Sequence, residues 1–264
     1  MRLFGYVLAL LVLAGLFLPS RSFAASSSSS PKTYEPVFHP FEQGESASYR
    51  ATWSGVPVAS ADVETRSVLI DGRKYYRVEV QARTWKYLEL IWKMRDSIES
   101  IFEHGTLRPR RFVFRQRENR KKTDTTAVFE SETKKWVIRR KEGKKIKDFE
   151  FVSQDTLDPI SAVYLARSLD FKVGDMLRLD VFGGKSRYQV TMDVVGQERI
   201  TTKAGEFNAY KIVPKIVNLT KSGYAGRVRQ ATVWISADEK RRPLKVVSQV
   251  FIGTVNIEWV GTKS

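Results

Sequence analysis

The sequence contains no cysteine, and this absence excludes several classes of protein at once. Disulfide scaffolds, cysteine-based zinc sites, iron–sulfur clusters and thiol catalysis all require that residue. With 264 residues, the chain is long enough to form an apolar core of its own. We therefore expect a fold that is stabilised by packing and hydrogen bonds without covalent cross-links.

Histidine is almost as scarce, since the chain has only His39 and His104. They lie in different segments, without the spacing of a metal motif such as H-E-x-x-H, and we interpret both as ordinary surface residues. Asp155 and Asp158 are typical of a turn and a helix cap, and the acidic loop with Glu45 needs no catalytic role. No nucleophile-elbow, Walker or Rossmann pattern occurs. The sequence therefore predicts no catalytic residue, no metal and no cofactor.

Long apolar runs are also rare. One extends from Phe4 to Leu18 after the positive charge of Arg2. It is short for a membrane span of ~20 residues, and small residues flank Phe23 in the sequence Ser22-Phe23-Ala24, as at a cleavage site. We expect residues 1–24 to be a signal peptide that is cleaved near Ala24 on export to the periplasm. A membrane anchor is the alternative.

The segment 25–37 that follows is rich in serine and has little apolar surface. Such a composition is typical of a flexible tether. We expect a linker over residues 25–37 and a single β-rich domain over residues 38–264.

Alternating apolar and polar residues dominate this domain. The pattern is clear in residues 75–82, 186–194 and 254–259, and it is typical of antiparallel strands with one wet face. Asp71-Gly72 between two such runs is a good two-residue hairpin turn. The fold class predicted is all-β, with a strongly curved antiparallel sheet that forms a half-barrel or a barrel. A two-sheet β-sandwich is the alternative.

One segment, residues 157–169, has helical spacing instead. Asp158 is a suitable N-cap, and Pro159 occupies the first helical position. Arg167 near the end suits a helix C-terminus. We predict one short helix here, between two sets of strands.

Acidic residues are outnumbered, at 29 Asp and Glu against 45 Lys and Arg. Without residues 1–24, which hold two arginines and no acid, the formal charge falls from +16 to +14. Residues 108–147 carry most of it, with sixteen basic and five acidic side chains and a net charge of +11. Such a surface attracts anions. For an exported protein we expect lipids or acidic glycans of the envelope, with the membrane surface as a further candidate and no nucleic acid.

Alternation gathers part of this charge on one predicted sheet face. The residues that share the face are Arg111, Arg115, Arg117, Arg139 and Lys141. We predict that they bind an anionic headgroup. The alternative is a solvated edge hairpin whose lysines prevent aggregation.

A second candidate site lies in residues 83–96, "RTWKYLELIWKMRD". Trp85, Leu88 and Trp92 are spaced three and four apart, as on a helical turn, and alternation from Leu90 onward indicates entry into a strand. We predict that Trp85, Tyr87 and Leu88 form an apolar lip at the mouth of the sheet and contact a lipid. A plug that fills the end of the barrel as core is the alternative.

Several stretches together resemble a family of bacterial exported proteins known only as a domain of unknown function, DUF3108. They are Gly44–Val63, Trp92–Phe112, Asp155–Arg167, Val173–Pro214, Val233–Val246 and Gly253–Val255. The resemblance covers most of the domain and implies export and a β-rich fold. It implies no cofactor and no known active-site residues.

Three functional hypotheses follow. The first is a periplasmic, non-enzymatic binding protein for an amphipathic or anionic envelope ligand, such as a lipid or a lipid-linked glycan. The second is an assembly or structural partner that binds a protein or an acidic glycan through the basic face. The third is an undetected hydrolase. The sequence leaves the oligomeric state open.

Overall fold

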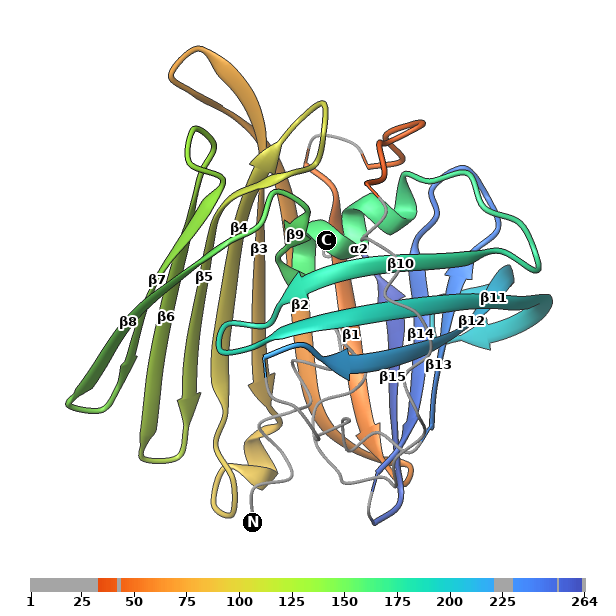
Figure 1. Ribbon diagram of the computed structural model, residues 1–264. Helices are drawn as coiled ribbons and strands as arrows, with labels where there is room; N and C mark the ends of the chain where they lie inside the picture. Colours follow the sequence, from red (N-terminus) through yellow and green to blue (C-terminus); the bar gives the residue numbers. More distant parts are fainter. Residues whose placement is uncertain (1–32, 42–43, 221–229, 251, 263–264) are drawn as a thin grey trace.

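The computed structural model describes residues 33–41, 44–220, 230–250 and 252–262 (Figure 1). The predicted signal peptide and the linker up to residue 32 lie outside the described residues. The strands are β1 (Ser46–Trp53), β2 (Val56–Ile70), β3 (Arg73–Thr84), β4 (Arg95–Glu103), β5 (Pro109–Glu118), β6 (Lys121–Glu130), β7 (Lys135–Glu142), β8 (Lys145–Val152), β9 (Thr156–Leu157), β10 (Met176–Phe182), β11 (Arg187–Thr202), β12 (Gly205–Asn218), β13 (Gln230–Ser236), β14 (Pro243–Gln249) and β15 (Thr254–Gly261). A 3-10 turn, η1 (Lys86–Leu88), and an α-helix, α2 (Pro159–Arg167), complete the secondary structure of the described residues.

The described strands form one sheet in the order β8-β7-β6-β5-β4-β3-β2-β1-β15-β14-β13-β12-β11-β10-β9. Neighbouring strands are antiparallel, apart from the parallel pair β9 and β10. The sheet is strongly curved and unclosed, which confirms the prediction of a half-barrel and makes the two-sheet sandwich wrong. Most strands pair with the next one in the sequence, and the pairing of β1 with β15 joins the two halves of the chain.

Aromatic side chains hold the two ends of the open sheet together. Phe149 and Phe151 on β8 lie with their ring centroids 6.3 and 5.5 Å from that of Phe182 on β10. Trp136 on β7, which is fully buried, packs against the same ring at 6.1 Å. Side-chain packing therefore closes the gap where no backbone ladder is formed.

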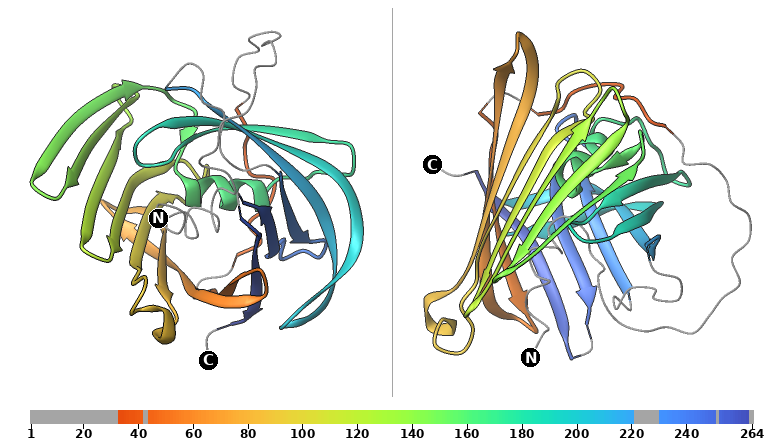
Figure 2. Two further views of the ribbon diagram at one scale, coloured as in Figure 1. Left: turned by 90° about the horizontal axis from the view of Figure 1, so that it is seen from below. Right: turned by 60° about the vertical axis from the view of Figure 1, so that its left-hand side comes forward.

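Helix α2 lies on the concave side of the sheet (Figure 2), and it begins where the sequence predicts. The carboxylate of Asp158 accepts hydrogen bonds from the backbone N–H groups of Ile160 and Ser161 at 2.8 and 3.1 Å, and Pro159 follows the cap. Every residue of α2 except Val163 is buried. The helix therefore fills the interior of the sheet and is part of the core. Among the described residues, no helix has the length and apolar character needed to span a bilayer.

The segment 33–41 lies against the domain. The N–H of Val37 donates to the carbonyl of Ser168 at 2.8 Å, and Phe41 packs against Tyr76 and Tyr164. Residues 33–37, at the end of the predicted linker, thus form hydrogen bonds with the domain.

Candidate functional site

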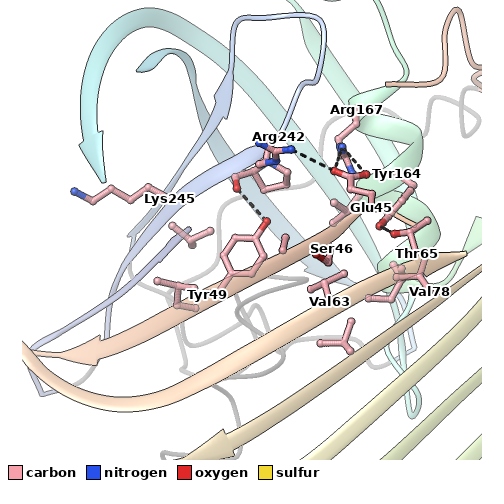
Figure 3. Close-up of a pocket in the computed structure, with 17 residues that line it drawn as sticks. Glu45, Ser46, Tyr49, Val63, Thr65, Val78, Tyr164, Arg167, Arg242 and Lys245 are labelled. Atoms are coloured by element: carbon pink, nitrogen blue, oxygen red, sulfur yellow. Dashed lines mark hydrogen bonds and ion pairs between the residues drawn. The ribbon is translucent and has the colours of Figure 1, made fainter. Parts of the chain in front are cut away.

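A small recess lies between α2 and the inner faces of β1, β2, β3, β14 and β15 (Figure 3). Its volume is about 60 Å³, and since a water needs ~10–15 Å³, it has room for a few water-sized groups. Its walls are largely aliphatic because alternation turns one side of each strand inward. The aliphatic side chains that line it include Val63, Val78, Val80, Val163, Val246 and Ile257.

A buried charge network forms the polar end of the recess. Glu45, directly before β1, lies between Arg167 at the end of α2 and Arg242 before β14 (Figure 3). Nη2 of Arg167 donates to both carboxylate oxygens, at 2.9 and 3.2 Å, and Nη2 of Arg242 is 3.9 Å from the nearer one. Two cations thus share one anion, and the network has a net charge of +1.

Arg167 is fully engaged by the protein. Besides Glu45, its guanidinium donates to the carbonyls of Lys240 and Arg241 at 3.1 and 3.2 Å. Its side chain is almost inaccessible to solvent. Burial, the largest single influence, acts to lower the pKa of Arg167, but the charge and hydrogen bond of Glu45, together with Tyr164 and Tyr49, raise the pKa above its usual value. Arg167 is therefore charged and serves to hold α2 against the sheet.

Arg242 is the cation with spare hydrogen-bonding capacity. Its guanidinium carbon lies 4.3 Å from the centre of the Trp259 ring, a stacked cation–π arrangement. Its buried Nε has no hydrogen-bond partner among the described residues. Lys245 also borders the recess, but its side chain points away from it (Figure 3) and its ammonium lies 5.9 Å from the ring centre of Trp234. Arg242 is thus the group that can meet an anion in the recess.

The hydroxyl groups near the recess are already bonded. Tyr49 donates to the carbonyl of Pro243 at 3.1 Å, and the hydroxyl of Tyr164 bonds that of Thr65. Burial raises the pKa of Tyr164 to about 12, so the phenol stays neutral. An apolar cavity with a cationic end and neutral hydroxyl groups suits binding of an anion better than proton transfer.

The five predicted headgroup residues do lie on one face, the outer face of β5 and β7. Three of them form ion pairs with neighbouring strands: Arg111 with Glu99 at 2.6 Å, Arg117 with Asp124 at 2.6 Å and Arg139 with Asp148 at 3.2 Å. Arg115 stands opposite Asp124, and Asp124 stands opposite Lys141. The carboxylates of adjacent strands therefore offset much of this positive charge. Anion binding at these residues stays a prediction.

The predicted lip divides into two parts. Trp85 and Tyr87 are exposed, while Leu88 is partly buried and packs with Trp92 against the core. The predicted helical turn is present as η1, and the N–H of Trp92 bonds the carbonyl of Leu88 at 2.7 Å. The strand starts only at Arg95, later than the alternation from Leu90 indicated. Contact of the lip with a lipid stays a prediction.

The two histidines lie next to each other: His39 is exposed, as the sequence suggested, and His104 is half-buried. Their rings stack with centroids 5.3 Å apart, and Nε2 of His104 lies 2.8 Å from the hydroxyl of Tyr76. Burial and the neighbouring His104 lower the pKa of His39. Among the described residues, no group of three or more His, Cys, Asp or Glu side chains could hold a metal ion.

Sequence reasoning missed the recess itself. The sequence indicates only a loop residue at Glu45, a helix-end cation at Arg167 and a turn at Arg242-Pro243, and it predicts none of the three as a site residue. The one available signal was a charged residue, Arg167, inside the apolar pattern of the helix. Its partner lies 122 positions away in the chain, so no local spacing joins the two.

One curved, unclosed sheet with a helix on its concave side defines a β-barrel-like protein. The chain belongs to the family described as protein of unknown function, DUF3108, whose profile matches residues 48–260. The resemblance seen in the sequence is thereby confirmed.

Among solved structures, the chain is similar to a β-barrel-like protein of the domain of unknown function DUF1849 from Brucella abortus. The TM-score is 0.52 at 10% identity, over 83% of this chain and 96% of the other. A candidate lipoprotein from Parabacteroides distasonis matches with a TM-score of 0.43 at 10% identity, over 86% and 99%. A candidate exported protein with a YmcC-like fold from Bacteroides fragilis matches with a TM-score of 0.37 at 10% identity, over 87% and 100%. The first likeness shows the fold alone, and the other two are too low to carry an argument. No curated protein matches the chain.

Proposed function

We propose that the protein is an exported, non-enzymatic binding protein of the cell envelope, and that it binds the anionic group of an amphipathic ligand in the recess beside α2. The observation that carries the proposal is the guanidinium of Arg242, whose side chain is 15% exposed and whose Nε is buried. Its Nε lacks a hydrogen-bond partner among the described residues and lies at the cationic end of an apolar cavity. A carboxylate or phosphate would supply the missing acceptor, and the bond would be charge-assisted.

The size of the recess limits what it can hold. A volume of about 60 Å³ admits a headgroup with the first atoms of an apolar chain, and the rest of a lipid must lie outside it. A lipid or a lipid-linked glycan with one acidic group fits this description. The apolar run from Phe4 to Leu18 and the small residues beyond it support export, and the periplasm follows as the compartment.

Dodecyl phosphate and dodecanol test the proposal, because they share an apolar chain and differ in charge. Calorimetry should show binding of dodecyl phosphate and at least tenfold weaker binding of dodecanol. Val163→Trp, which fills the recess, and Arg242→Gln, which removes its cation, should each weaken dodecyl phosphate binding about tenfold or more.

Val173→Trp is the matched control, since Val173 is exposed and lies outside the recess. It adds the same bulk to the surface and should bind like the wild type. Equal affinity of the wild type and the Val163→Trp variant for dodecyl phosphate would refute the recess as the binding site. Mass spectrometry of lipid extracted from the wild-type protein would then identify any natural ligand.

A second candidate is an assembly partner that uses the outer face of β5 to β8. The observation in its favour is the edge strand β8, whose outward Ile146 and Val152 are exposed beside the cations of β7. An exposed edge is a place where another chain can add a strand. The ion pairs across this face reduce its attraction for an acidic partner, so we rank it second.

A further inference from the structure

Exposed apolar side chains gather at the end of the sheet where η1 lies, at the bottom of Figure 1. They come from three connections: the β1–β2 turn, the η1 segment and the β14–β15 turn. We call this set the tip patch, and its members are Val56, Trp85, Tyr87, Leu90, Ile91 and Ile252. Leu90 is 96% exposed and Ile91 is 72% exposed, which is costly in water for a side chain that has no other role.

Hydrogen bonds fix the three connections to one another. The hydroxyl of Tyr87 donates to the carbonyl of Pro57, and the N–H of Trp85 donates to that of Val58 at 3.2 Å. On the other side of the β1–β2 turn, Nε1 of Trp53 donates to the carbonyl of Ile252 at 2.7 Å. The tip patch is therefore one surface and not a scatter of single residues.

Leu88 and Trp92 anchor the η1 segment from below. Both pack against the core, whereas Trp85, Leu90 and Ile91 face outward. The anchor keeps the outward side chains in place, since it ties the segment to the end of the barrel. The packing of Leu88 and Trp92 therefore fixes the exposed position of the apolar side chains beside them.

A row of arginines borders the tip patch on the outer face. Strand register places Arg50 opposite Ser60, Ser60 opposite Arg83 and Arg83 opposite Arg95. The guanidinium of Arg50 lies 5.5 Å from the ring centre of Trp85, which joins the row to the patch. Lys86 at the start of η1 and Lys93, five residues after its end, are also exposed.

Two acids lie among these five cations. Glu89 pairs with Arg95 at 2.6 Å and with Lys93 at 3.9 Å, and Glu258 stands opposite Arg50. The border of the tip patch therefore keeps a net charge of +3. An apolar end with aromatic rings and a positive border matches a bilayer interface, where Trp and Tyr lie at headgroup level and Lys and Arg meet phosphates.

We propose that the tip patch docks this end of the barrel onto a bilayer that contains anionic phospholipid. The side chains project from loop ends at one tip of the sheet, and six residues are too few for a stable protein interface, which uses ~20–30 residues on each side. The proposal does not depend on the recess, because the tip lies at the far end of β1 from Glu45. The tip patch would bind the surface of a bilayer, whereas the recess would bind a single ligand molecule.

Vesicle sedimentation with the full chain tests the proposal. Vesicles of phosphatidylethanolamine and phosphatidylglycerol provide an anionic surface, and vesicles of phosphatidylcholine provide a neutral one. We expect the protein to bind the anionic vesicles at least tenfold more strongly than the neutral ones, with weaker binding at high salt. Leu90→Ser/Ile91→Ser should lower binding to the anionic vesicles at least tenfold, and Arg83→Gln/Arg95→Gln should lower it several-fold.

Leu69→Ser/Val152→Ser is the matched control, since both residues are exposed and lie outside the tip patch. It should bind vesicles like the wild type. All variants change exposed side chains, and an unaltered unfolding midpoint shows that they fold. Equal binding by the tip variant and the wild type would overturn the proposal. So would a wild-type dimer in sedimentation that the tip variant dissociates, because the patch would then be covered by a second copy.

Discussion

The cap of α2 allows a sharp test of how the buried helix is held. Asp158 is inaccessible to solvent and accepts hydrogen bonds from the N–H groups of Ile160 and Ser161 and, at 2.6 Å, from the hydroxyl of Ser100 on β4. Asp158→Ala removes the cap, at ~0.5–2 kcal/mol, and leaves the buried hydroxyl of Ser100 without this acceptor, at ~1–3 kcal/mol. We expect the free energy of unfolding in urea to fall by about 2–4 kcal/mol.

Asp158→Asn keeps one acceptor oxygen and should cost less than the alanine variant. The comparison of wild type and Asp158→Asn also gives a pH dependence. Burial raises the pKa of Asp158 from its ordinary value of 3.8 to about 6, although hydrogen bonds from Ser100, Ser161 and Ile160 act in the opposite direction. The folded state therefore keeps a proton between these two values that the unfolded state has lost.

The sign of the effect follows from this proton. Stability rises with pH only where the unfolded state binds more protons, and here it binds fewer. The free energy of unfolding of the wild type, relative to Asp158→Asn, should fall by on the order of 2–3 kcal/mol as pH rises from ~4 to ~6. Urea titrations at pH 4, 5, 6 and 7 measure this difference. A difference that is flat or rises with pH would refute the reasoning, as would an alanine variant within ~0.5 kcal/mol of the wild type.

Three further outcomes are expected. Trp136→Ala should lower the free energy of unfolding by ~3–5 kcal/mol in urea, because this ring is fully buried at the gap between the sheet ends. Arg167→Met should cost ~3–5 kcal/mol, since it leaves Glu45 buried with a more distant cation, and adding Glu45→Gln should recover part of the loss. Because burial and His104 lower the pKa of His39, stability should be full above the unfolded pKa near 6.5 and fall as pH drops below it. Hydrogen exchange in the segment that carries His39 should show loss of protection at pH 5.5, and less loss in His104→Gln.

The elements of the fold could be predicted because their signals are local. Alternation identifies a strand from its own residues, and Asp158-Pro159 marks the start of α2 within a few positions. The environment of α2 could not be predicted in the same way. Its sequence shows one apolar stripe, which suggests one buried face, yet Ser161 and Arg167 are buried on the others. Their partners come from the helix cap and from Glu45, and only the folding of the curved sheet around α2 brings Glu45 near.

The basic face illustrates a different limit. Alternation correctly placed Arg111 and Arg139 on one side of the sheet, but a count of charge within residues 108–147 overstated their availability. Glu99 and Asp148, which pair with them, lie just outside that segment. Cross-strand neighbours on a sheet face interact directly, so the charge of such a face is set by the strands on either side. The net charge of a continuous segment of sequence therefore does not give the charge of the sheet face to which it belongs.

For residues 83–96, "RTWKYLELIWKMRD", the sequence analysis offered two alternatives, an exposed lip or a buried plug, and the structure shows that different residues of the segment are exposed and buried. The N–H of Trp92 bonds the carbonyl of Leu88, so these two residues lie on the inner side of the turn and pack against the core, while Leu90 and Ile91 are exposed on its outer side. A segment that served only the core would carry polar residues on its second face. This one carries apolar residues on both, and hydrogen bonds through the β1–β2 turn connect it to the turn that holds Ile252, more than 150 residues away. The local sequence therefore contains both the residues that pack against the core and the apolar residues that are exposed. The tip patch that the exposed residues form with the other two turns exists only in the folded sheet.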